Sequence, residues 1–235
     1  MKRIVALIPL FLSTALSFGA SDDWQEVLRD DDIVVFRKKI EGSPVLAFRG
    51  EATVNAPIAK VMTAIKDPNQ RGKWTERVKS FQIIEEHSPC DRTEYMHVSS
   101  PFPARDRDFV IRSKLAFDEQ SKKIVVQLRS VEDERRKKTI GKIRGVMHSS
   151  SFSLQPVNTG TTKIEAELHA DPKGAVPKWL VNHFQKLVPK KSLSNLKKYL
   201  SENQVADDPM TVAFFSKTPH QRFPASDKNL HCVAK

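Results

Sequence analysis

The middle of the chain, from Val78 to Leu168, alternates strand-like segments with short turns, and this succession restricts the fold more than any other feature. Consecutive strands on short loops pair as antiparallel neighbours, because parallel pairing needs long crossover connections. A long amphipathic segment follows at 177–200 and has an apolar stripe to bury. We therefore predict an α+β fold, in which a long C-terminal helix lies on the concave face of a curved antiparallel sheet.

The period of the apolar residues gives the expected elements one by one. The strands predicted in the middle region are 78–86, 93–99, 108–117, 123–131, 142–155 and 161–168. Earlier strands are predicted at 33–37 and 44–54, and a helix follows from 58 to 65. Residues 22–29 have a short helical pattern through Trp24, Val27 and Leu28. Pro189 predicts a kink or a break between two helices in the long amphipathic segment.

The first 20 residues have the pattern of a secretory signal peptide, with a basic start, an apolar run and polar residues directly afterwards. Ser17 and Gly19 are small enough for cleavage after Gly19. The alternative is an uncleaved amphiphilic anchor. We predict a signal peptide at 1–20, one folded domain at 21–201, and a C-terminal tail of low order at 202–235 with a small apolar cluster at 212–215.

The basic charge of the chain predicts attraction to anionic surfaces. Its 39 Lys and Arg residues against 28 Asp and Glu residues give a net charge of +11, which falls to +9 when Lys2 and Arg3 leave with the signal peptide. An exported, periplasmic or secreted protein meets anionic lipid far more often than nucleic acid. We therefore expect transient contact with membrane surfaces and no nucleic-acid partner. For each basic cluster taken singly, a solvated face or turn is the simpler interpretation, and attraction to a membrane surface is the second.

The cysteines and histidines favour neither a metal centre nor a catalytic site. Two cysteines, Cys90 and Cys232, are too few for a zinc module or a disulfide-rich miniature, and they could form one disulfide or remain two thiols. The histidines lack the i, i+4 pairing of a helical metal site, and the sequence contains no Gly-x-Ser-x-Gly or His-Glu-x-x-His motif. We predict no catalytic residue, no metal and no cofactor.

Two segments carry a resemblance to a known family. Residues 100–110, Ser-Pro-Phe-Pro-Ala-Arg-Asp-Arg-Asp-Phe-Val, and residues 171–182, Asp-Pro-Lys-Gly-Ala-Val-Pro-Lys-Trp-Leu-Val-Asn, are similar to the Ω-loop and to the start of the C-terminal helix in the StAR-related lipid-transfer (START) family. Trp74 resembles the Trp of that family's Trp-Asp pair, although Thr75 departs from it. The resemblance extends over about 24–200 and indicates a secreted, single-domain member of bacterial type.

The resemblance implies a helix-grip fold with an internal hydrophobic tunnel that holds one lipid, such as a phospholipid or a sterol. The expected activity is to bind this lipid and to transfer or present it at membranes, as a monomer and without catalysis. Two alternatives remain open: an enzyme of the wider helix-grip class, such as a cyclase or hydrolase, and a lipid sensor that transfers nothing. A filled core without ligand would produce the same apolar periodicity.

Side-chain alternation and the resemblance together suggest which residues contact the lipid. The candidate lipid-binding residues are Trp74, Glu94, Met96, Val98, Phe102, Phe109, Ile111, Ser113, His148, Ser150, Phe152, Trp179, Phe184 and Leu187. For His148, Ser150, Phe152 and the helix residues, membership of an ordinary core is the simpler interpretation.

Glu94 and Phe102 each have two open interpretations. Glu94 lies among apolar neighbours, so it is either at an exposed rim or functional. Some sterol-binding members of the resembling family keep an acidic residue in this strand with an Arg in the next one, but here Ser113 holds the Arg position and Arg112 should point away. Phe102, between two prolines, is either an apolar tip that enters a membrane interface or a plug on the core.

Overall fold

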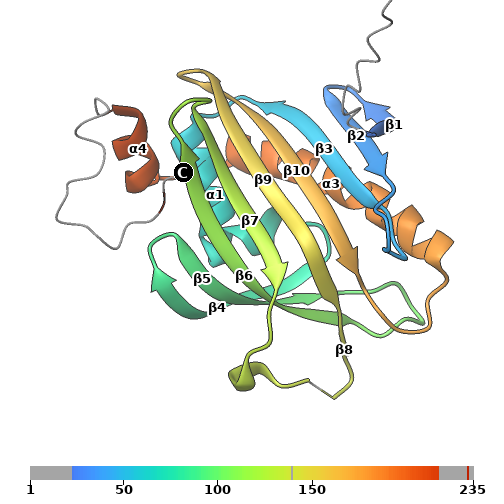
Figure 1. The fold of residues 1–235 in the computed structure, drawn as a ribbon. Coiled ribbons are helices and arrows are strands. Elements are labelled where there is room, and N and C mark those ends of the chain that lie inside the picture. Colours follow the sequence, from blue (N-terminus) through green and yellow to red (C-terminus); the bar gives the residue numbers. More distant parts are fainter. Residues whose placement is uncertain (1–22, 139, 217–231, 233–235) are drawn as a thin grey trace, which may run out of the picture.

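The computed structural model describes residues 23–138, 140–216 and 232, in which an antiparallel sheet curves around one long helix (Figure 1). The predicted signal peptide lies outside the described residues. The strands are β1 (Gln25–Asp30), β2 (Ile33–Lys38), β3 (Ala47–Val54), β4 (Val78–Ser88), β5 (Asp91–Val98), β6 (Arg107–Asp118), β7 (Lys123–Ser130), β8 (Ile143–Arg144), β9 (Val146–Asn158) and β10 (Thr161–Asp171). The helices are α1 (Ile58–Lys66), α2 (Pro68–Trp74), the 3-10 turn η1 (Glu134–Arg136), α3 (Lys178–Glu202) and α4 (Pro209–Ser216).

The predicted fold class is confirmed. The strands follow the order β1-β2-β3-β10-β9-β7-β6-β5-β4, and the short β8 pairs in parallel with the start of β6. The ladder between β3 and β10 joins an early strand to the last one, so the sheet closes around α3 from both sides. Among the described residues, no helix combines the length and the apolarity needed to cross a membrane.

One local prediction near the N-terminus is wrong. Residues 25–30 form a strand rather than a helix, because a turn with Asp31 at φ 51° folds them back onto β2. Six residues are too few to distinguish helical from strand periodicity. Pairing with the next strand in the sequence therefore decides the conformation of this segment. The helix predicted at 58–65 is confirmed as α1, which ends at Lys66 directly before Asp67 and Pro68. Asp67 accepts a hydrogen bond from the Asn69 backbone N–H at 2.9 Å and starts the separate short helix α2.

Helix α3 is continuous from Lys178 to Glu202 with Pro189 inside it, which excludes a break into two helices and leaves the kink as the remaining predicted alternative. At Pro189 the helix lies against β3, where Gly50 leaves room for it. A Cβ atom at Gly50 would lie 2.7 Å from the Pro189 Cβ and 2.9 Å from the Leu193 Cδ1. Glycine at position 50 therefore allows the backbone of the sheet to come this close to the helix.

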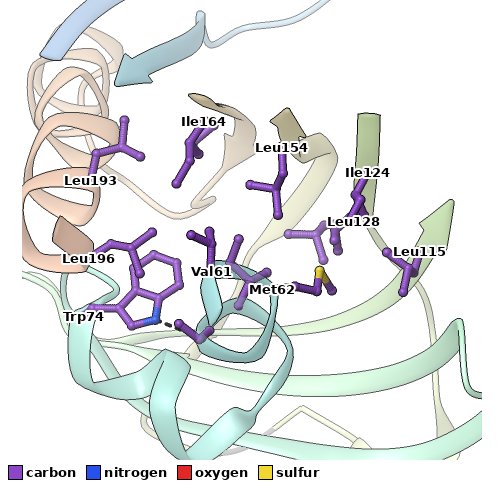
Figure 2. Packing of buried hydrophobic residues seen from close by; sticks show 14 of the residues in the cluster. Val61, Met62, Trp74, Leu115, Ile124, Leu128, Leu154, Ile164, Leu193 and Leu196 are labelled. Carbon is purple, nitrogen blue, oxygen red and sulfur yellow. Dashed lines mark hydrogen bonds between the residues drawn. The ribbon is translucent and has the colours of Figure 1, made fainter. Parts of the chain in front are cut away.

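The core fills the space between the sheet, α1 and the second half of α3 (Figure 2). Leu193 and Leu196 of α3 are fully buried against Ile164 and Leu154 of the sheet. Trp74 is also buried, and its indole N–H donates to the Ala64 carbonyl at 2.9 Å. This satisfied donor lets a large aromatic side chain fill the core without an unpaired polar atom.

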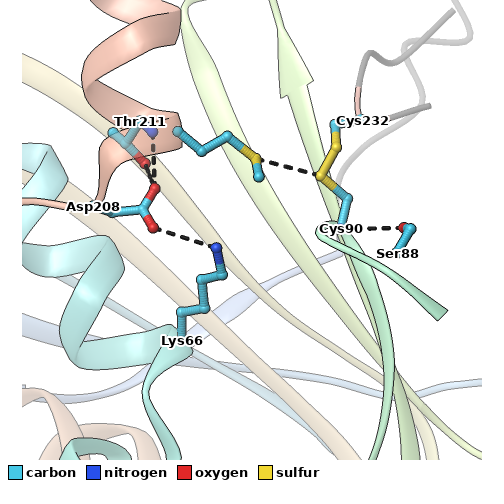
Figure 3. The surroundings of a disulfide bond; sticks show 7 residues. Lys66, Ser88, Cys90, Asp208, Thr211 and Cys232 are labelled. Carbon is cyan, nitrogen blue, oxygen red and sulfur yellow. Dashed lines mark hydrogen bonds and ion pairs between the residues drawn. A yellow bond between two sulfur atoms is a disulfide. The ribbon is translucent and has the colours of Figure 1, made fainter. Parts of the chain in front are cut away.

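Helix α4 packs against the core with Phe214. Residues 209–216 are therefore folded, although the sequence predicts low order for the tail 202–235 apart from the apolar cluster at 212–215. Phe214 is fully buried, and its ring centroid lies 4.7 Å from that of Phe117 in β6. Asp208 accepts hydrogen bonds from the Thr211 N–H and hydroxyl and pairs with Lys66 at 3.3 Å (Figure 3).

The two cysteines form a disulfide, which resolves the alternative that the sequence left open. Cys90, between β4 and β5, is bonded to Cys232 with a Cα–Cα distance of 5.7 Å (Figure 3). The carbonyl of Cys232 also accepts a hydrogen bond from the Phe117 N–H at 2.7 Å. The C-terminal segment is therefore joined covalently to the sheet at residue 232.

Candidate functional site

The first half of α3 and the sheet enclose a cavity of about 680 Å³. The helix supplies one wall and the inward face of β5, β6, β9 and β10 supplies the other. Most lining side chains in the interior are apolar, and they are Met96, Val98, Phe109, Leu128, Met147, Phe152, Ala166, Leu168, Ala170, Leu180, Val181, Phe184 and Val188. One half of α3 therefore faces a hollow while the other half is packed in the core.

Two loops form the mouth of the cavity: residues 99–106 between β5 and β6, and residues 172–177 between β10 and α3. Both loops contribute lining residues. Phe102 belongs to the first loop, and 98 % of its surface is exposed. The structure therefore places Phe102 in solvent at the mouth, away from the core, which excludes the plug interpretation.

The structure distributes the fourteen predicted residues between the cavity and its surroundings. Those that line the cavity are Met96, Val98, Phe102, Phe109, Ser150, Phe152 and Phe184. Those outside the lining are Trp74, Glu94, Ile111, Ser113, His148, Trp179 and Leu187. Whether the lining residues contact a ligand stays a prediction.

Depth along the strand explains why two predicted residues of β6 lie outside the cavity lining. Ile111 and Ser113 share the inward face with Phe109 and are buried, as alternation requires. However, they lie further along β6, where the interior is packed rather than hollow. Trp74 is excluded for the same reason, because its ring fills the core beside α1. Alternation identifies a face of the sheet but not the part of that face that borders a cavity.

A β-bulge explains why His148 lies outside the cavity lining. The register of β9 against β10 shifts between Met147 and Ser149, so Met147 lines the cavity and the His148 ring packs 4.9 Å from that of His169. Burial lowers the pKa of His169, and the neighbouring His148 lowers it further.

On α3, Phe184 lines the cavity as predicted, but Trp179 and Leu187 lie outside the lining. Trp179 is 71 % exposed and Leu187 is half-buried outside the lining, whereas Leu180, Val181 and Val188 face the cavity.

Glu94 is fully buried, so the predicted exposed rim position is wrong. Its carboxylate forms ion pairs with Arg71 of α2 at 3.3 Å and with Arg92 of its own strand. Arg92 also donates to the Lys66 carbonyl at 2.6 Å. Burial lowers the pKa of Arg71, and the Glu94 carboxylate partly offsets this effect. The three groups together carry one excess positive charge inside the protein.

Arg71 lines the cavity, and sequence reasoning missed it. Its guanidinium lies over the rings of Phe81 and Phe152, with centroid distances of 4.3 and 5.6 Å. Because a buried carboxylate needs a cation, Glu94 among apolar neighbours predicts that a basic side chain lies beside it. Nothing in the sequence indicates which of the many arginines is that partner.

Two buried polar atoms of lining residues have no hydrogen-bond partner in the described part of the chain. They are Nε of Arg71, a donor, and Oε1 of Gln185, an acceptor whose amide nitrogen already donates to the Ala170 carbonyl at 2.6 Å. Each such atom costs roughly 1–3 kcal/mol when it stays unpaired. The cavity is therefore suited to a mainly apolar molecule with a polar end. Across residues 23–138, 140–216 and 232, no cluster of His, Cys, Asp or Glu could hold a metal ion.

Comparisons with known proteins place the chain among proteins of this architecture. The model of the START domain matches residues 15–204. Human StAR-related lipid transfer protein 5 has a TM-score of 0.73 and 22 % identity over 77 % of this chain and 88 % of its own. A STAR-related lipid transfer protein of Xanthomonas axonopodis has a TM-score of 0.68 and 25 % identity over 77 % and 99 % of the two chains. An uncharacterized protein of Pseudomonas aeruginosa is 23 % identical over 177 residues, 75 % of this chain and 86 % of that protein.

Replacing Glu94 tests the buried charge cluster. Glu94→Gln leaves two buried guanidinium groups without a counter-charge, and we expect unfolding in urea to show a loss of about 3–5 kcal/mol. Asp91→Asn is the matched control, because Asp91 pairs with Arg112 near the surface, and its loss should stay below about 1 kcal/mol. Equal losses in the two variants would show that the cluster has no special role.

Proposed function

Because the chain belongs to the START domain family, we propose that it binds a single hydrophobic lipid in the cavity and transfers or presents it at membranes. One observation carries the proposal: a mainly apolar cavity of about 680 Å³ opens between two loops at one end of the sheet. This volume lies within the roughly 300–1,000 Å³ typical of small-molecule sites. Burial of acyl or ring carbons supplies the driving force, at about 0.8 kcal/mol per CH₂ group.

The polar end of the lipid binds near Arg71 and Gln185 in this proposal. Both side chains line the cavity, but the unpartnered Nε of Arg71 and Oε1 of Gln185 are buried, so each side chain must turn to present that atom. A phosphate, carboxylate or hydroxyl oxygen then accepts a hydrogen bond from Arg71, and a hydroxyl group donates to Gln185. The excess positive charge around Glu94 favours an acceptor-rich or anionic group.

Transient docking on anionic membranes completes the proposed mechanism, with the protein acting as a monomer. Phe102 of the mouth and Ile140, in the connection between β7 and β8, are 98 % and 100 % exposed. Both connections lie at the end of the sheet opposite the β9–β10 hairpin (Figure 1). Apolar tips can enter the membrane interface while neighbouring cations such as Arg105 meet anionic headgroups.

We further propose that the protein is an exported, single-domain protein of bacterial type. The basic and apolar N-terminal pattern supports cleavage of a signal peptide. The disulfide between Cys90 and Cys232 supports an oxidising compartment such as the periplasm or the exterior of the cell.

Filling the cavity tests the binding function. Ala166→Phe and Ala170→Phe add a ring to the lining; we expect each to lower the affinity for dansylated undecanoic acid about tenfold or more and to reduce the lipid that co-purifies, as seen by mass spectrometry. Ala206→Phe adds the same ring at an exposed position and should bind like the wild type. Wild-type binding by both lining variants contradicts the proposal.

The same samples separate the alternative functions. A changed mass of the extracted ligand after incubation indicates an enzyme, and binding without movement of lipid between vesicles indicates a sensor.

Truncating Phe102 tests membrane docking. Because the side chain is exposed, Phe102→Ala should leave the melting temperature nearly unchanged and slow lipid transfer to anionic vesicles about tenfold. Transfer by the wild type should also fall with added salt. Val157→Ala, at the exposed β9–β10 hairpin, is the matched control with normal transfer expected. Salt-independent transfer at the wild-type rate in Phe102→Ala rules out this docking mode.

Mass spectrometry of the exported protein tests localisation and the disulfide together. We expect a soluble chain that begins at Ala20 or Ser21, with the Cys90 and Cys232 peptides linked under non-reducing conditions. Met1 retained on membrane-bound protein contradicts export, and free thiols on freshly exported protein contradict the disulfide.

A further inference from the structure

Arg107 connects the two loops of the mouth. It is the first residue of β6, and only 4 % of its surface is exposed. Toward the 99–106 loop, its Nη1 donates to the Ser100 hydroxyl at 3.0 Å and to the Arg105 carbonyl. Toward the 172–177 loop, its Nε and Nη2 donate to the carbonyls of Pro172 and Lys173, both at 3.2 Å. The planar guanidinium of Arg107 therefore forms hydrogen bonds to both loops of the mouth.

The charge of Arg107 is balanced in an unusual way. A buried cation normally pairs with a carboxylate, yet in the part of the chain that the structure describes no carboxylate forms an ion pair with Arg107. The carboxylates of its two sequence neighbours form ion pairs with other residues: Asp106 pairs with Lys79 and His97, and Asp108 pairs with Arg144. Backbone carbonyls of the two loops therefore stabilise the guanidinium, and separating the loops removes them.

The second loop has little freedom to move while Arg107 is bound to it. Gly174 has φ +81°, and a Cβ atom there would lie 2.8 Å from the Ile143 Cδ1 and 3.6 Å from Nη2 of Arg107. The turn around Gly174 is therefore held between Ile143 of β8 and the guanidinium. Ile143 and Arg107 both line the cavity at the mouth.

We propose that Arg107 is the latch of the mouth: it joins the 99–106 and 172–177 loops in the closed state, and its hydrogen bonds to one of them must break before a ligand passes. This inference rests on the proposed function. Arg107 is a positioning residue in this scheme, because it acts on the loops rather than on the ligand.

A latch has a kinetic signature that a ligand contact lacks. The same opening step precedes uptake and release, so a weaker latch raises both rate constants by the same factor and leaves their ratio, the Kd, unchanged. A residue that contacts the ligand instead changes the Kd, mainly through the dissociation rate. Lysine keeps the positive charge but lacks the planar fork of donors, so it cannot hold four acceptors at once.

Stopped-flow fluorescence with dansylated undecanoic acid and the full chain tests the latch. We expect Arg107→Lys to raise the association and dissociation rate constants about tenfold each, with a Kd that stays within about twofold. Arg129→Lys, the same replacement on an exposed side chain of β7 outside the cavity lining, is the matched control and should behave as the wild type. Unchanged rates in Arg107→Lys, or a raised Kd with an unchanged association rate, overturn the inference.

Two further measurements keep the test decisive. If Arg107→Lys fails to fold, Ser100→Ala removes one acceptor and keeps the other hydrogen bonds, and both rates should still rise, by about threefold; wild-type rates in this variant overturn the inference. Amide hydrogen exchange without ligand should be faster at 99–106 and 172–177 in Arg107→Lys. If the wild type binds no lipid probe, the proposed function fails, and hydrogen exchange alone then decides whether Arg107 holds the loops together.

Discussion

The contact between α3 and β3 at Gly50 determines how the interior is divided. A Cβ atom at position 50 would come within 2.7 Å of Pro189, so only glycine lets the helix lie this close to the sheet. On one side of this contact, Leu193 and Leu196 are completely buried and the interior is packed. On the other side, the helix lines the cavity with Leu180, Val181, Phe184, Gln185 and Val188. A continuous helix thus serves as a core element along one half and as the wall of the cavity along the other.

Buried charges hold the elements around this cavity in place. Glu94 joins α2 to β5 through Arg71, and Arg92 ties the same carboxylate to the end of α1 through the Lys66 carbonyl. At the other end of the cavity, Arg107 ties the loops of the mouth to the start of β6. Burying any of these charged groups without its partners costs free energy. The segments that supply the partners therefore stabilise one another. The apolar cavity is in this way bounded by polar clusters that maintain its shape.

The packed end of the molecule is reinforced by a C-terminal segment beyond the helix-grip elements. Phe214 of α4 completes the core against Phe117, and Cys232 is bonded to Cys90 at the β4–β5 turn. The disulfide closes a long loop between residues 90 and 232, which lowers the entropy of the unfolded chain. This segment lies far from the mouth along the sheet (Figure 1). The C-terminal contacts therefore stabilise the packed end of the molecule and not the loops of the mouth.

Local pattern in the sequence was sufficient for the antiparallel strand order, the long final helix and the inward face of strands such as β6. It failed where several distant segments decide the outcome. Residues 25–30 became a strand because β2 pairs with them, and Met147 replaced His148 at the cavity because of a bulge between β9 and β10. Phe109 and Ile111 share one face, yet only Phe109 lines the cavity. Periodicity determines which side of a strand is buried, because it depends on adjacent residues alone. Whether that side meets a packed core or a hollow depends on how closely α3 approaches, which only the tertiary structure decides.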